Sequence, residues 1–286
     1  KAIKQAPLMF WVQDLWPESL EATGAVHSAC LIRMMERLVR FIYRRCDRIL
    51  VQSEAFFQPI RRLVGDDSRI LYFPNSAEKI YKSVDLPPDA SERSVLPSGF
   101  CVMFAGNIGV AQDFETILKA ANFLRNHSDI QWVILGDGRR RSWVEQQIKK
   151  QKLEQIVHFL GRYPIEAMPR FFSLADVMLV TLKKEPFFAL TIPAKIQSYM
   201  ACGKPVVGAL DGEGARVIEE AGAGIASRAG DPRALADAIL KMRAMSADSL
   251  AAMGRHGKDY FERHFERKML IQHLEKWMQE LLVEKQ

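Results

Sequence analysis

Glycine-flanked polar stretches that follow apolar runs are the parts of this sequence whose residue types suit chemistry. FAGNIGV and LGDG each close an apolar run and precede a helix-like segment. Glycine lets backbone approach a phosphate, and a helix N-terminus offers N–H groups and a positive dipole end. The two stretches therefore predict an anion site. Its candidate residues are Gly106, Asn107, Ile108, Gly109, Gly136 and Asp137.

Each of these stretches also has a structural alternative. The first could be a tight turn without ligand, and no G-x-G-x-x-G is present, which argues against a nicotinamide or flavin cofactor. Asp137 could meet a hydroxyl group or cap the next helix. The arginine run 139–141 lacks interleaved aromatic residues and zinc-ligand spacing, so no nucleic-acid partner is expected. No cofactor and no metal are predicted.

A lysine follows at a position that favours an anionic ligand. In LKKEPFFALTIPAK, Pro193 suits an early helix position, so Lys195 falls in the first turn. A cation there opposes the helix dipole, which is mildly unfavourable unless a diphosphate lies opposite. Lys195 is the candidate catalytic cation, and Lys183 and Arg162 are its candidate helpers.

DGEGARVIEE is a second glycine-flanked helix start. Glu213 could cap this helix electrostatically, or it could point into a crevice and accept a hydroxyl hydrogen bond. The second reading makes Glu213 a candidate catalytic residue, with Gly214 and Ala215 as binding residues beside it.

The elements that must position these residues alternate between apolar and helix-period segments. Strands are expected at 100–106, 130–136, 156–161, 176–182, 204–210 and 224–227. Such alternation predicts α/β architecture with a doubly wound parallel sheet. In the order 3-2-1-4-5-6, ligands bind where the first and fourth strands diverge. The Gly106–Gly109 turn and the 183–195 connection would face each other across this crevice.

The N-terminal block is shorter than a doubly wound domain. It has three expected strands, at 8–16, 48–53 and 69–75, with helices at 29–46 and 54–64. Three strands would leave an apolar sheet edge unpaired, so we expect the first part of this domain to be absent. The expected divisions are an N-terminal domain at 1–85, a linker at 86–99, a second domain at 100–262 and a C-terminal helix at 263–286.

Two helical segments carry distinctive patterns. Apolar residues at 4-3-4 spacing make the C-terminal segment amphipathic, and we expect it to cross back onto the first domain. They are Leu270, Leu274, Trp277 and Leu281. Segment 32–48 is rich in arginine and could lie on an anionic membrane, or be a core helix with a basic outer face. The formal net charge of +6 also favours anionic ligands.

The chain resembles the C-terminal two-thirds of GT-B-fold group 1 (family 4) glycosyltransferases, in the bacterial surface-polysaccharide branch that is similar to fucosamine transferases. The resemblance rests on DLWPES, FAGNIG, LGDG, PAKIQSYMACGKPVV and DGEGARVIEEAGAG. It implies two Rossmann-like domains facing a cleft, a nucleotide-sugar donor on the second domain, and no bound metal. It also implies that the backbone near Arg162 and Tyr163 meets the base.

The sequence departs from this family pattern at charged positions. Two glutamates eight positions apart are replaced by Leu190 and Ser198, and the usual cations of the glycine turn by Asn107 and Gln112. Hydroxyl recognition is therefore assigned to Glu213 and Ser198, with Glu185 as a further candidate. Phosphate charge is assigned to Lys195, helped by Lys183 or Arg162.

The resemblance implies a transferase that moves a sugar, such as an N-acetylated deoxy or amino sugar, from a UDP-linked donor to a lipid-linked glycan. The pathway would be O-antigen or capsule assembly, in the cytoplasm at the inner face of the bacterial inner membrane. Four cysteines without a C-x-x-C fit a reducing compartment. Two alternatives stay open: a nucleotide-sugar 2-epimerase of the same fold, and a non-catalytic UDP-sugar-binding subunit.

Overall fold

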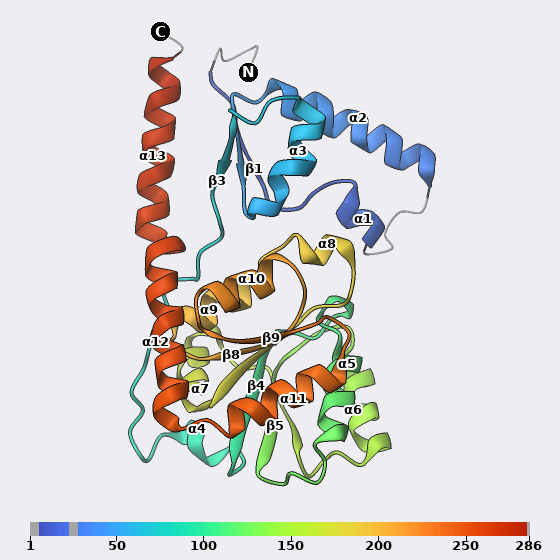
Figure 1. Cartoon of the computed structure of the whole chain (residues 1–286), viewed down its shortest axis with the longest axis vertical. Coiled ribbons are helices and arrows are strands. Elements are labelled where there is room, and N and C mark those ends of the chain that lie inside the picture. The colour runs from blue at the N-terminus through green and yellow to red at the C-terminus, as the bar shows by residue number, and fades with distance from the viewer. Residues whose placement is uncertain (1–5, 23–27, 285–286) are drawn as a thin grey trace.

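The computed structural model describes residues 6–22 and 28–284, and within them the chain builds two parallel sheets (Figure 1). The expected segments at 1–85 and 263–286 therefore lie partly outside the described residues. The larger sheet has the strand order β6-β5-β4-β7-β8-β9, and the smaller one β1-β2-β3. The prediction of an α/β fold with two Rossmann-like sheets is confirmed.

The larger sheet has the doubly wound order that the alternating sequence predicts. Its strands are β4 (Phe100–Asn107), β5 (Ile130–Asp137), β6 (Val157–Gly161), β7 (Val177–Thr181), β8 (Val206–Ala209) and β9 (Gly224–Ser227). All neighbouring strands pair in parallel. The register aligns Gly106 with Gly136 and Asn107 with Asp137, so the two glycine stretches end at one edge of the sheet.

The strands of this sheet are buried on both faces, because an apolar layer packs on each face. The first face packs on α5 (Phe114–Phe123), α6 (Arg141–Gln151) and α11 (Pro232–Arg243). The second packs on α7 (Met168–Leu174), α9 (Ala194–Ala201), α10 (Glu213–Glu220) and α12 (Ala247–His264). Shorter elements are η2 (Val110–Gln112), η3 (Ile165–Ala167) and α8 (Pro186–Ala189). Neighbouring residues on β4 show the alternation, since Phe104 packs in the first layer and Met103 in the second.

The smaller sheet joins β1 (Met9–Val12), β2 (Arg48–Val51) and β3 (Ile70–Tyr72). It packs on α2 (Ala29–Arg45), η1 (Glu54–Phe56) and α3 (Phe57–Val64), close to the expected helix positions. The first strand is shorter than the expected 8–16, because the chain turns after Val12 and forms α1 (Glu18–Ala22). The short helix α4 (Ser91–Ser94) lies within the stretch expected to be the linker.

Helices α13 (Arg267–Val283) and α8 both carry apolar contacts between the two parts of the molecule. The C-terminal helix α13 follows α12 and runs back along the smaller sheet (Figure 1). Its Leu270 is buried with Leu50 and Phe73. On the other side, α8 extends from the larger sheet, and Phe187 is buried in the core of the smaller one.

Candidate functional site

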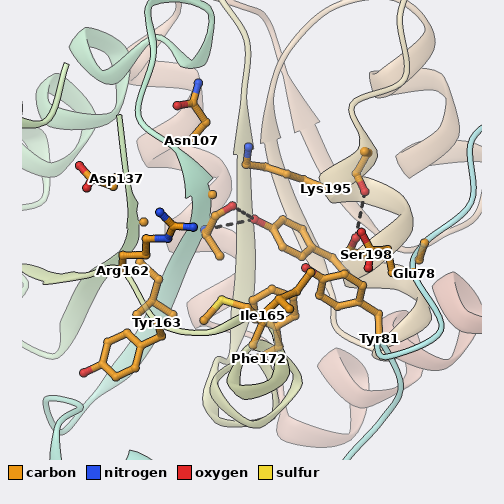
Figure 2. A pocket seen from close by; sticks show the side chains of 18 of the residues that line it. Glu78, Tyr81, Asn107, Asp137, Arg162, Tyr163, Ile165, Phe172, Lys195 and Ser198 are labelled. Atoms are coloured by element: carbon orange, nitrogen blue, oxygen red, sulfur yellow. Dashed lines mark hydrogen bonds between the residues drawn. The ribbon is translucent and has the colours of Figure 1, made fainter. Parts of the chain in front are cut away.

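A cavity of about 570 Å³ opens at the carboxyl edge of the larger sheet, where β4 and β7 diverge (Figure 2). Its walls are the ends of β4 and β5, the loop after β6, η3, α7, the first turns of α9 and a segment at 76–81 that leads away from the smaller sheet. The size is that of an ordinary small-molecule site. We call it the cleft pocket.

Eight of the sequence-predicted binding residues line the cleft pocket. They are Gly106, Asn107, Gly136, Asp137, Arg162, Tyr163, Lys195 and Ser198. They come from β4, β5, the loop after β6 and α9, so the topological argument for a crevice at this edge places them together. The cations Arg162 and Lys195 approach the cavity from different elements (Figure 2).

The glycines at this edge serve backbone and side-chain packing. A β-carbon on Gly106 would lie 2.8 Å from both Cε and Nζ of Lys195, so glycine leaves the space that the lysine side chain fills. A β-carbon on Gly136 would lie 1.9 Å from the carbonyl oxygen of Gly106. Both residues have positive φ, at 130° and 143°. Glycine is needed at both positions for these close approaches.

Lys195 is half-buried and has no carboxylate partner among the described residues. Its Nζ lies 5.1 Å from the ring centroid of Phe104. Burial lowers the pKa of Lys195 to about 8. The hydroxyl of Tyr199 holds α9 against β4, because it donates to the Ala105 carbonyl and accepts from the Ala105 N–H, both at 3.2 Å. The lysine therefore has a fixed place beside the end of β4.

The Gly109 turn is closed by hydrogen bonds within the chain. The Ile108 N–H donates to the Asp137 carbonyl at 2.8 Å, and the Gly109 N–H donates to the Gln112 side chain at 3.1 Å. Ile108 is fully buried, and neither residue lines the cleft pocket. Asp137 does not cap α6; its carboxylate instead accepts from the Gly138 N–H at 2.8 Å.

The remaining predicted residues lie outside the cleft pocket. The side chain of Lys183 is exposed, and its backbone N–H donates to the Ala111 carbonyl. Gly214 packs closely on Leu210, and Ala215 lines a separate small hollow. Glu185, on the loop before α8, is likewise not among the lining residues.

Glu213 belongs to an ion-pair cluster that joins the two sheets. Its carboxylate accepts from Arg216 at 3.0 and 3.1 Å and from the Ser53 hydroxyl at 3.3 Å. Arg216 also pairs with Glu54 at 3.6 Å and with Glu220 at 2.5 Å. The structure therefore places Glu213 at the junction between the sheets and away from Lys195.

Leu190 lies at the same junction. It is half-buried against the apolar core of the smaller sheet, beside Phe187 and Phe188. Ser198, the other position where the family pattern has a glutamate, faces the cleft pocket, and its hydroxyl donates to the Ala194 carbonyl at 3.1 Å. The two departures thus have different surroundings.

The segment 74–83, which we call the strap, supplies pocket residues that the sequence analysis did not find. Ser76, Glu78 and Tyr81 line the cavity. In Figure 2, Glu78 and Tyr81 lie on the side opposite Asp137 of β5. They lie before the expected linker in a stretch without a motif. Only the path of the chain between the two sheets brings them to α9.

Neither a metal-binding cluster nor a membrane-spanning helix is found among the described residues. Within 6–22 and 28–284, no three or more His, Cys, Asp and Glu side chains lie close enough to hold a metal ion. In the same ranges, no helix combines the length and the apolar character needed to cross a membrane.

Comparisons with known proteins agree with this architecture. The model of the family described as "Glycosyl transferases group 1" matches residues 99–244, half of the chain. The chain is 30% identical over 258 residues to "Probable glycosyltransferase WbjE" of Pseudomonas aeruginosa, covering 85% of this chain and 62% of WbjE. It is 27% identical over 138 residues to WcaI of Escherichia coli, a protein named for colanic acid biosynthesis, covering 47% of this chain and 33% of WcaI.

Among solved structures, HepE of Anabaena in complex with UDP superposes with a TM-score of 0.78 at 18% identity, covering 98% of this chain and 74% of HepE. This likeness confirms the GT-B-like fold. The chain spans less than two thirds of the length of the curated relatives WbjE and WcaI.

Proposed function

Because this chain belongs to the group 1 glycosyl transferases, we propose that it is a glycosyltransferase that takes a sugar from a UDP-linked donor held in the cleft pocket. The observation that carries the proposal is the position of Lys195. Its ammonium lies beside the end of β4, in the first turn of α9, without a carboxylate partner in the described part of the chain. A half-buried cation at a helix N-terminus is suited to a diphosphate.

The chemistry requires stabilisation of a leaving diphosphate. The bond between the anomeric carbon and the β-phosphate oxygen breaks, and the oxygen of the acceptor hydroxyl bonds to that carbon. The hydroxyl proton passes to the departing diphosphate or to water, and negative charge grows on the diphosphate as it leaves. Lys195 and the N-terminus of α9 bind this charge more strongly as it grows, which accelerates the step. The backbone near Arg162 and Tyr163, on the opposite wall, receives the base.

The donor is a UDP-linked N-acetylated deoxy or amino sugar, and the acceptor is a lipid-linked glycan of a bacterial surface polysaccharide. The name of WcaI, which refers to colanic acid biosynthesis, supports a role in polysaccharide assembly. A relative from Bacillus anthracis, named N-acetyl-alpha-D-glucosaminyl L-malate synthase, supports an N-acetylated sugar. The UDP bound in the HepE complex supports UDP as the nucleotide of the donor.

The outer face of α2 provides contact with an anionic bilayer that carries the acceptor. Met34, Leu38 and Phe41 are 60%, 56% and 52% exposed and follow one another at helical spacing. Arg33 and Arg37 lie on the neighbouring face. An apolar stripe beside arginines is the pattern of a helix that lies in a membrane interface.

UDP binding tests the donor proposal directly. UDP should raise the melting temperature of the chain in a concentration-dependent way, whereas ADP and GDP at equal concentration should have less effect. Equal responses to all three nucleotides would reject a uridine site. Mixing the protein with UDP-sugars and lipid-linked glycans should then give transfer, also in EDTA. Donor turnover without acceptor would instead support the epimerase, and binding without turnover the non-catalytic subunit.

Vesicle sedimentation tests the membrane proposal. The protein should sediment with vesicles of anionic phospholipid at low salt and remain in solution with neutral vesicles. Replacing Arg33 and Arg37 by Gln should weaken sedimentation by about 1 kcal/mol for each charge near the surface. The matched control replaces Lys149 and Lys150 of α6, on the larger domain. A wild-type protein that ignores anionic vesicles would contradict the proposal.

A further inference from the structure

The cleft pocket contains two carboxylates, and one of them has no partner among the described residues. The Asp137 carboxylate accepts from the Gly138 N–H at 2.8 Å and lies 3.8 Å from Arg141. No hydrogen bond or ion pair engages the side chain of Glu78 within the described ranges. Glu78 belongs to the strap and lies in the same wall region as Ser198 (Figure 2).

The strap is anchored to the larger domain on both sides of Glu78. Before it, the fully buried Gln197 donates from Nε2 to the Asn75 carbonyl at 3.0 Å. After it, the ring of Tyr81 stacks on Phe172 with centroids 5.7 Å apart. Further along, the Ser83 hydroxyl donates to the Cys202 carbonyl at 3.2 Å. These contacts fix the backbone that presents Glu78 to the cavity.

Helix α9 itself contributes no strong acceptor to the wall region near Ser198. Ser198 has a short, neutral side chain whose hydroxyl already donates to the Ala194 carbonyl. It lies three residues after Lys195, and therefore on the same face of α9, one turn away from the proposed diphosphate. A ribose joined to that diphosphate carries two adjacent hydroxyl groups, and one carboxylate can accept hydrogen bonds from both.

We propose that Glu78 is the residue of the cleft pocket that recognises the ribose hydroxyls of the nucleotide, from the strap rather than from α9. This inference rests on the proposed function, since it requires a uridine nucleotide in the pocket. Glu78 thereby supplies from the strap the carboxylate that α9 lacks at Ser198. Ribose recognition then depends on the position of the strap between the two sheets.

Calorimetry with UDP and 2′-deoxy-UDP tests the inference. Wild-type protein should bind UDP about tenfold or more tightly than 2′-deoxy-UDP, because the lost hydrogen bond goes to a charged group. Glu78→Gln should bind UDP about tenfold more weakly than wild type and should discriminate poorly between the two nucleotides. Glu78→Asp, which keeps the charge on a shorter side chain, should lie between them.

The matched control is Glu275→Gln, an exposed carboxylate that lines the hollow on the other side of the strap. It should keep both the wild-type affinity and the wild-type ratio. A Glu78→Gln protein with the wild-type ratio would overturn the assignment of Glu78 while leaving the proposed function intact. Wild-type protein that binds neither nucleotide would overturn the proposed function, and this inference with it. Unchanged melting of the free variants would show that folding is preserved.

Discussion

Two helices at the carboxyl edge of the larger sheet each carry a charged residue in the first turn, and these residues differ in their surroundings. Helix α9 follows β7 and presents Lys195 to an open cavity without a carboxylate partner in the described chain. Helix α10 follows β8 and presents Glu213 to Arg216 and to Ser53 of the smaller domain. A helix start in this fold can thus bind a ligand or join domains, depending on what lies across from it.

The same contrast separates the two positions where the family pattern has glutamates. Leu190 packs against the core of the smaller sheet, on the junction side. Ser198 faces the cavity, on the pocket side. A carboxylate at the first position would oppose apolar packing, whereas a carboxylate at the second would face solvent and ligand. The departures therefore need separate explanations.

The largest expected effect belongs to Lys195 on the pocket side. Lys195→Ala should lower kcat for sugar transfer about 100- to 1,000-fold, because it removes a preorganised cation worth about 3–4 kcal/mol in the transition state. Lys195→Arg should stay partly active. Lys183→Ala is the matched control, since Lys183 is exposed and outside the cavity. A Lys195→Ala enzyme that keeps more than about a third of the wild-type kcat would show that the α9 start is no more important for transfer than the α10 start.

On the junction side, restoring a carboxylate should damage folding. Leu190→Glu should destabilise the protein by about 1–3 kcal/mol, because it places a charge in a half-buried apolar contact. Thermal unfolding would measure the loss. Ser198→Glu, on the pocket side, should leave the melting temperature nearly unchanged. Equal melting temperatures for the two variants would show that apolar packing at Leu190 does not stabilise the junction.

A pH titration should separate ligand binding from folding stability. Burial lowers the pKa of Lys195 to about 8, so the ammonium is lost as pH rises through 8. UDP affinity should then fall by up to about tenfold per pH unit above 8. Between pH 8 and the usual lysine range, the unfolded chain binds more protons, so this group makes stability rise with pH. Lys195→Arg should flatten both trends; an unchanged binding profile would count against Lys195 as the titrating group.

The smallest effect is expected at Glu213. Glu213→Gln should cost about 1 kcal/mol or less in stability, because Arg216 is 36% exposed and solvent screens the pair. Transfer should keep kcat within about threefold of wild type. A loss of kcat as large as that expected for Lys195→Ala would show that Glu213 takes part in the reaction. The contrast between the two helix starts would then not hold.

Much of the site could be predicted because each strand and helix that carries its residues follows from a local sequence pattern. Alternating apolar runs predicted the strand order, and that order brought Gly106, Arg162 and Lys195 to one crevice. The role of Gly106 was harder to foresee. Its missing β-carbon was expected to admit a phosphate, yet in the structure the space holds the side chain of Lys195. The contact between Gly106 and Lys195 could not be foreseen from the sequence, because 89 positions separate the two residues.

The sequence by itself determined the periodicities and chain order from which the parallel sheet, its layers and the helix start at Lys195 follow. These are local properties, because side-chain alternation and helix capping act over a few residues. The tertiary structure alone decided that Glu78 reaches the cavity, that Glu213 turns to Arg216, and that Leu190 seals a domain junction. Each depends on a contact between the two sheets, and such contacts arise from packing over distances that no local pattern records.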